Sequence, residues 1–183
     1  MRGKVTRYLT LMATDTHTSL RHGILSDELA ENRAQLIEML TKAYWMEIET
    51  VMSYIANSIN PEGVRAQEII ESLEEDIQEE LGHARQFGTR IKELYGVVPG
   101  SLDFNAEQSY LQPPDDQVDI VHVIKGVIEA ETGAIDFYNQ IIEFCEGKDP
   151  VTQDMVIAIL RDEEGHRRLF EGFLREYKSE GLA

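Results

Sequence analysis

The chain has very little cysteine. Cys145 is the only one in 183 residues. A single thiol excludes an internal disulfide framework, a Cys-x-x-Cys redox pair and a four-thiolate metal centre within one chain. Such sparse cysteine is typical of a reducing compartment, so we expect a cytoplasmic protein.

Positive charge is also scarce, with 17 Lys and Arg against 34 Asp and Glu and a net charge of -17. A nucleic-acid partner is therefore not expected, because binding to phosphates needs a basic face. The start of the chain departs from this balance, with Arg2, Lys4, Arg7 and Arg21 against one acid, Asp15. We expect a flexible basic tail over residues 1–25, within which Met12 is an alternative start.

Long apolar runs are missing as well. No run approaches the roughly 20 apolar residues that cross a bilayer, so no membrane partner is expected. Only five prolines occur, and apolar residues make up 42% of the chain. This composition and length predict one globular domain.

Helical periodicity fills most of the chain after residue 25 and no strand pattern competes with it, so the expected fold class is all-α. Asn60-Pro61 and the segment 147–150 give short joins, which favour two antiparallel hairpins. The expected helices span 26–59, 61–95, 118–146 and 150–177.

The segment 96–117 has no helical period and holds three of the five prolines. A helix of 30 residues is about 45 Å long, and this segment can extend to about 70 Å. It can therefore cross the whole length of a bundle, which allows the second and third helices to be parallel. We expect a four-helix bundle over 26–177, made of two hairpins joined by one long crossover, and a short tail at 178–183.

Two matching motifs carry metal-binding chemistry. Glu80 precedes His83 by three residues, and Glu163 precedes His166 by three, each in a Glu-x-Gly-His sequence. A spacing of three places carboxylate and imidazole on one helix face, where both can reach one metal ion or two adjacent ions.

A further carboxylate, Glu131, projects from an apolar stripe and is expected to be buried. Glu129 has mostly polar or small neighbours and is interpreted as surface. The residues one turn from Glu131 are all apolar: Val127, Ile128, Ala134 and Ile135.

An internal repeat selects the fourth carboxylate. Glu131 is followed seven residues later by Tyr138, and Glu47 is followed seven later by Tyr54. The shift between these pairs is 84 residues, close to the shift of 83 between the two Glu-x-Gly-His motifs. Glu49 finds no acidic counterpart under either shift, so Glu47 is the better choice.

Four inward carboxylates repel one another in a low-dielectric core and need compensation. Two divalent cations would balance them, and a carboxylate-rich set suits iron or manganese better than tetrahedral zinc. The sequence does not rank iron against manganese. The alternative to a metal-binding enzyme is a metal-free bundle with a structural role.

These motifs resemble the ferritin-like di-iron carboxylate superfamily, and most closely its bacterioferritin-like branch, over about residues 28–177. The segments that carry the resemblance are EIETVMSY from Glu47 to Tyr54, EELGHARQF around Glu80 and His83, EAETGAIDFY around Glu131, and DPVTQDMVIAILRDEEGH ending at His166.

The resemblance implies a ferroxidase that binds two Fe(II) per chain and oxidises them with oxygen or hydrogen peroxide, and a homo-oligomer. It implies that Glu80 and Glu163 bridge the two irons. Glu47 with His83, and Glu131 with His166, would complete one iron each. Tyr54 and Tyr138 would lie beside these ligands.

The chain departs from the patterns of several ferritin-like families, and each departure bears on the expected cofactor, activity or assembly. Haem-binding bacterioferritins carry a methionine where this chain has Leu81, so haem is not expected. Ala134 and Ile135 replace the extra carboxylate of rubrerythrins, although rubrerythrin-like peroxide reduction stays an alternative. Only residues 178–183 follow the fourth helix, where 24-subunit cages carry a fifth. Dps-type proteins, with metal sites between subunits, resemble the chain less.

Overall fold

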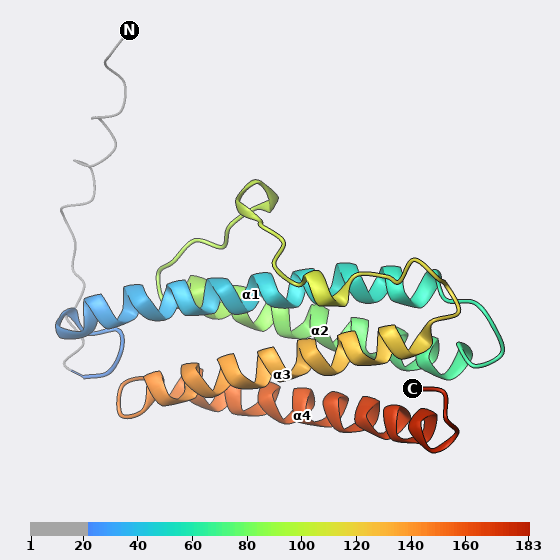
Figure 1. Ribbon diagram of the computed structural model, residues 1–183. Helices are drawn as coiled ribbons and strands as arrows, with labels where there is room; N and C mark the ends of the chain where they lie inside the picture. Colours follow the sequence, from blue (N-terminus) through green and yellow to red (C-terminus); the bar gives the residue numbers. More distant parts are fainter. Residues whose placement is uncertain (1–21) are drawn as a thin grey trace, which may run out of the picture.

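The computed structural model describes residues 22–183, and these form a bundle of four long helices without strands (Figure 1). The all-α fold class is thereby confirmed. Most of the expected basic tail, including Met12, lies outside the described residues, but Ile24 packs into the core. The helices are α1 (Ala30–Ile59), α2 (Gln67–Glu93), α3 (Ile120–Cys145) and α4 (Pro150–Ser179).

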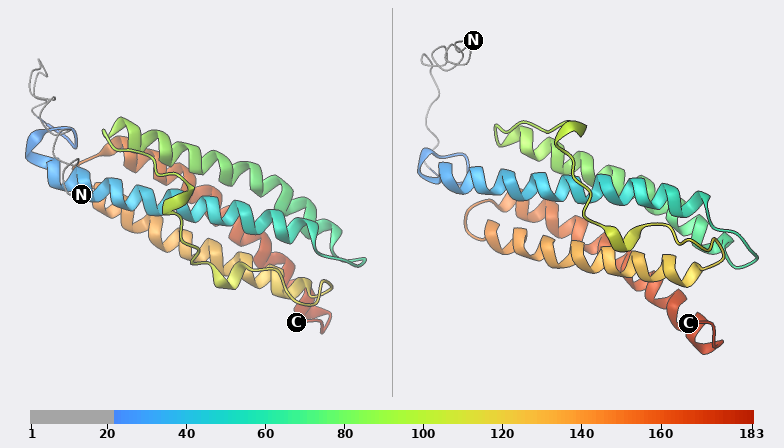
Figure 2. Two further views of the ribbon diagram at one scale, coloured as in Figure 1. Left: turned by 90° about the horizontal axis from the view of Figure 1, so that it is seen from above. Right: turned by 45° about the horizontal axis from the view of Figure 1, so that its top comes forward.

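The connectivity is two antiparallel hairpins joined by one crossover, as expected. α1 pairs with α2 and α3 pairs with α4, while the crossover runs the length of the bundle along α1 and α3 (Figure 2). α2 and α3 are therefore parallel. The crossover contains two single turns of 3-10 helix, η2 (Ser101–Asp103) and η3 (Ser109–Leu111).

Two helix starts differ from the sequence expectation. Ser26 makes no side-chain cap, and a 3-10 turn, η1 (Asp27–Leu29), precedes α1. The second helix begins at Gln67 rather than Pro61, because Gly63 has a φ of 99° and cannot continue a right-handed helix. The Glu62 N–H instead donates to the Gln117 carbonyl at 2.9 Å, which ties this join to the end of the crossover.

The join between α3 and α4 follows the expected pattern. Gly147 adopts a left-handed φ of 69° after α3, and Asp149 caps α4 by accepting hydrogen bonds from the backbone N–H groups of Val151 and Thr152. The buried Asp149 carboxylate also accepts two hydrogen bonds of 3.0 Å from Arg90 near the end of α2. This ion pair links the two hairpins at one end of the bundle.

The crossover is held against the bundle by specific contacts. The buried Glu49 carboxylate accepts hydrogen bonds of 2.7–2.9 Å from the backbone N–H groups of Glu107 and Gln108. Asn57 donates to the Leu111 carbonyl at 2.8 Å. On α3, a Cβ on Gly126 would lie 2.8 Å from the Tyr110 carbonyl oxygen, so the absence of a side chain permits this close approach.

The apolar core is divided into two clusters. One contains Leu36, Phe87, Ile141 and Val156, and the other contains residues such as Leu73, Val127 and Phe170. The bundle also buries charged side chains, among them four glutamates: Glu47, Glu80, Glu131 and Glu163. Within residues 22–183, no helix is both long enough and apolar enough to cross a membrane.

Candidate metal centre

The structure brings all six candidate ligands together in the interior, one or two from each helix. α1 supplies one glutamate, α3 supplies another, and α2 and α4 each supply a glutamate and a histidine. None is more than 8% exposed: Glu47, Glu80, His83, Glu131, Glu163 and His166. We call these residues the six-residue cluster.

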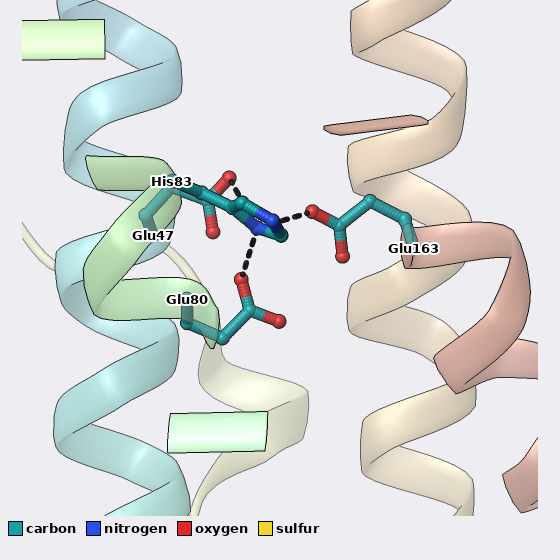
Figure 3. A group of neighbouring side chains, drawn as sticks. All are labelled: Glu47, Glu80, His83 and Glu163. Atoms are coloured by element: carbon teal, nitrogen blue, oxygen red, sulfur yellow. Dashed lines mark hydrogen bonds and ion pairs between the residues drawn. The ribbon is translucent and has the colours of Figure 1, made fainter. Parts of the chain in front are cut away.

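On one side of the six-residue cluster, His83 faces three carboxylates (Figure 3). Its Nδ1 lies 3.1 Å from Glu163 Oε1 and 3.3 Å from Glu80 Oε2. The Glu47 carboxylate completes this group, with Oε1 at 4.0 Å. Ligand atoms of these four residues all lie within 4.8 Å of one another, close enough to hold one metal ion.

On the other side, His166 repeats this arrangement. Its Nδ1 lies 3.5 Å from Glu80 Oε1 and 3.6 Å from Glu163 Oε2, and Glu131 Oε1 lies at 4.0 Å. Glu80 and Glu163 thus direct one oxygen to each histidine. The six-residue cluster contains two four-residue groups that share these two carboxylates.

The two tyrosines join the hairpins through the remaining carboxylates. Tyr54 on α1 donates its hydroxyl hydrogen to Glu131 on α3, and Tyr138 on α3 donates to Glu47 on α1. Both tyrosines are fully buried. Each therefore fixes the carboxylate that the opposite hairpin contributes.

The carboxylates of the six-residue cluster hold protons unequally. Burial raises the pKa of Glu47 and of Glu131 well above the usual range, and the charges of Glu80 and Glu163 add to this. Burial alone would also raise the pKa of Glu80, but hydrogen bonds with Glu47, His166 and His83 outweigh it and hold that pKa below the usual range.

The histidines gain protons from the same surroundings. Burial would lower the pKa of His83, but hydrogen bonds with Glu163 and Glu80 outweigh it and raise the pKa to about 10. The same two carboxylates raise the pKa of His166 to about 12 against the effect of burial. Without metal, protons supply the positive charge that the four carboxylates require.

The polar atoms at the centre fit divalent metal ions. Three of them are buried and make only long or poorly directed polar contacts within the six-residue cluster: Glu80 Oε1, Glu163 Oε1 and His166 Nδ1. Buried atoms of this kind need a compensating partner. Four carboxylates and two imidazoles are also the donor set that suits iron or manganese.

Three further carboxylates, which the sequence motifs did not predict, contact the histidines at Nε2, on the side away from the other ligands. Glu79 Oε2 lies 2.9 Å from His166 Nε2, and Asp162 Oδ2 lies 3.4 Å from His83 Nε2. Buried Asp76 lies 3.6 Å from His166 Nε2, and burial chiefly raises its pKa to about 7. Such contacts fix the orientation of a histidine that binds metal through its other nitrogen.

The internal repeat held a signal for two of these residues. Glu79 and Asp162 each directly precede one of the glutamates shared between the two groups, so they match under the shift of 83 residues. The two rejected acids differ from each other: Glu129 is exposed as expected, whereas Glu49 is buried and bound to the crossover.

Comparison with known proteins places the chain in a known family. A family model described as the ferritin-like domain matches residues 37–179. The DNA protection during starvation protein of Pyrococcus furiosus is 32% identical over 145 residues, which cover 76% of this chain and 77% of the relative. This relative carries a Dps-type name, whereas the six candidate ligands of this protein all lie within one chain.

Two solved structures share the fold. The bacterioferritin-related protein of Bacteroides fragilis, described as a dodecameric thioferritin, has 26% identity and a TM-score of 0.68 over 81% of this chain and 89% of that one. The bacterioferritin of Desulfovibrio desulfuricans, described with a diiron site, has 23% identity and a TM-score of 0.70 over 81% and 83% of the two chains.

Proposed function

Because the chain belongs to the ferritin-like domain family, we propose that it binds two ferrous ions at the six-residue cluster and oxidises them with oxygen or hydrogen peroxide. The observation that carries the proposal is the sharing of Glu80 and Glu163 between two groups of metal-ligating side chains. The bacterioferritin of Desulfovibrio desulfuricans, described with a diiron site, supports iron as the substrate.

In this proposal Glu80 and Glu163 each give one oxygen to each ferrous ion. Glu47 and His83 complete the ligands of one ion, and Glu131 and His166 complete those of the other. The Nδ1 atoms of both histidines would face the ions. On the outer side, Asp162 and Glu79 accept hydrogen bonds from the Nε2–H groups of His83 and His166 and fix both rings.

The reaction is a two-electron oxidation by the pair. Each Fe(II) gives up one electron, and hydrogen peroxide with two protons takes both electrons to form two water molecules. Oxygen with two protons takes the same two electrons to form hydrogen peroxide. Holding both ions within one cluster makes the two electrons available together, which favours a two-electron oxidant over stepwise reduction.

Mixing experiments on the purified protein test this proposal. Iron-free protein receives two equivalents of Fe(II) without air and is mixed with either oxidant, and Fe(III) formation is followed by its absorbance. The parent should oxidise iron at least about tenfold faster than a Glu80→Gln, Glu163→Gln variant. Equal rates in the two proteins would contradict a role for the six-residue cluster in oxidation.

We also propose that the chain forms a homo-oligomer, because its Bacteroides fragilis relative is described as dodecameric. The described chain alone leaves large apolar side chains exposed along α1, including Met52, Ile55 and Ile59. Spacings of three and four place them on one helix face, which is typical of a surface covered by another chain.

A further inference from the structure

The two halves of the six-residue cluster match even in their outer partners. Glu79 contacts His166 and Asp162 contacts His83, each from the position before a shared glutamate. Both outer side chains are about half exposed, at 56% and 49%. Water screens these two carboxylates to a similar extent, although Glu79 lies closer to its histidine, at 2.9 Å, than Asp162 does, at 3.4 Å.

Asp76 breaks this match. Asp76 is only 5% exposed, and its Oδ1 lies 3.6 Å from His166 Nε2. The shift of 83 residues that relates Glu80 to Glu163 relates Asp76 to Ile159, which belongs to an apolar core cluster. Only the His166 half therefore has a second, buried carboxylate in this place.

Packing does not account for this carboxylate. Asp76 Oδ2 is buried without a hydrogen-bond partner, which costs stability. The other half fills the equivalent place with the apolar side chain of Ile159. A carboxyl group kept at such a cost needs an explanation beyond packing, and its one close cation-forming neighbour in the described contacts is the His166 ring.

We propose that Asp76 is a positioning residue that makes the two metal positions unequal. The position at Glu131 and His166 then binds a divalent ion more tightly than the position at Glu47 and His83. This inference rests on the proposed function.

The physical reason is the charge behind the imidazole ring. A metal ion bound at Nδ1 draws electron density from the ring, and a negative charge beside Nε2 stabilises the polarised ring. The charge of Asp76 acts through the protein interior and is weakly screened, whereas Asp162 faces solvent. The ion nearer Asp76 is thus bound first.

Titration of the full-length protein with Co(II) alone, followed by visible absorbance, tests this order. The parent should bind two ions in two separate steps. Asp76→Asn should weaken the tighter step about 10-fold or more and change the weaker step less than about 2-fold. Asp76→Glu, which keeps the charge, should retain two separate steps.

A double variant shows whether Asp76 acts through His166. In a His166→Ala background, Asp76→Asn should cause no further loss of affinity. The matched control, Asp162→Asn, should weaken only the step assigned to His83, and by a smaller factor. Far-UV circular dichroism of each variant verifies that the four helices form.

The outcomes separate this inference from the proposed function. A parent that binds no Co(II) or other divalent ion contradicts the proposed function, and the inference fails with it. A parent that binds two ions, with Asp76→Asn leaving both steps unchanged or weakening both equally, contradicts the inference alone. An Asp76→Asn loss that persists without His166 also overturns it.

Discussion

At the scale of single residues, the two buried tyrosines hold carboxylates across the bundle. Tyr138 donates to Glu47, and both side chains are shielded from water. Removing this hydroxyl leaves a buried acceptor without its partner, which costs about 1–3 kcal/mol. Tyr138→Phe should lower the free energy of unfolding of the metal-free protein by this amount in urea denaturation.

A matched control distinguishes this hydrogen bond from the loss of any tyrosine hydroxyl. Tyr177 donates to the Arg65 carbonyl in a solvent-exposed hydrogen bond. Tyr177→Phe should change the free energy of unfolding by less than about 0.5 kcal/mol. Equal losses in the two variants would contradict the special role given to the Tyr138 hydroxyl.

The raised pKa values set the pH dependence of the metal-free protein. The pKa of Asp76 is about 7 and that of His83 is about 10 in the folded chain, above their ordinary values of 3.8 and 6.5. A group that binds its proton more tightly when folded stabilises the fold below its unfolded pKa. That stability is lost as the pH rises through the folded pKa.

The melting temperature of the metal-free protein should therefore fall between about pH 6 and about pH 9, by about 3 °C or more. Bound metal replaces the protons, so the difference in melting temperature between the metal-loaded and the metal-free protein should grow as the pH rises. Calorimetry at several pH values measures both trends. A flat or rising melting temperature in the metal-free protein would contradict the assigned pKa directions.

Sequence spacing could locate most of the candidate site at this scale. The paired Glu-x-Gly-His motifs and the apolar neighbours of Glu131 were enough to find residues that the fold brings together. Asp76 escaped because a single acid in a helix carries no periodic signal of its own. Its contact with His166 joins two helices that lie far apart in the sequence, and only the packed structure shows that contact.

At the scale of elements, the contact between the crossover and α3 depends on a missing side chain. A Cβ on Gly126 would lie 2.8 Å from the backbone oxygen of Tyr110, whereas a Cβ on Gly165 would meet nothing within 4 Å. Gly126→Ala should destabilise the protein by about 1–3 kcal/mol. Gly165→Ala should stabilise it by about 0.5–1 kcal/mol, because alanine favours a helix interior.

Urea denaturation of the two metal-free variants measures both effects. The opposite signs matter more than the magnitudes, since each change adds the same methyl group to a helix. If Gly126→Ala were as stable as Gly165→Ala, the crossover could not lie against α3 as described.

Helix periodicity predicted the elements better than their starts. The long periodic stretches appear as four helices, and the crossover spans the bundle as its length allowed. The start at Pro61 was wrong because proline favours a first turn without requiring one, and Gly63 turns the chain instead. The burial of Glu49 could not be predicted from the sequence, because its hydrogen-bond partners are backbone N–H groups of the crossover.

At the scale of the whole molecule, the exposed apolar residues of α1 predict association. The proposed homo-oligomer should sediment at several times the 20.9 kDa mass of one chain in analytical ultracentrifugation. Ile55→Asp and Ile59→Asp together should shift the protein towards smaller species, because charge on an apolar interface opposes burial. A parent that sediments as one chain would contradict the assembly.

We propose that one chain holds two ferrous ions at the six-residue cluster. Elemental analysis of protein loaded with Fe(II) in the absence of oxygen, beside a Glu80→Ala, Glu163→Ala variant, tests it most directly. Two irons per chain are expected in the parent and few in the variant, which lacks both shared carboxylates. Parent protein that retains no specific iron, or a variant that retains as much as the parent, would contradict it.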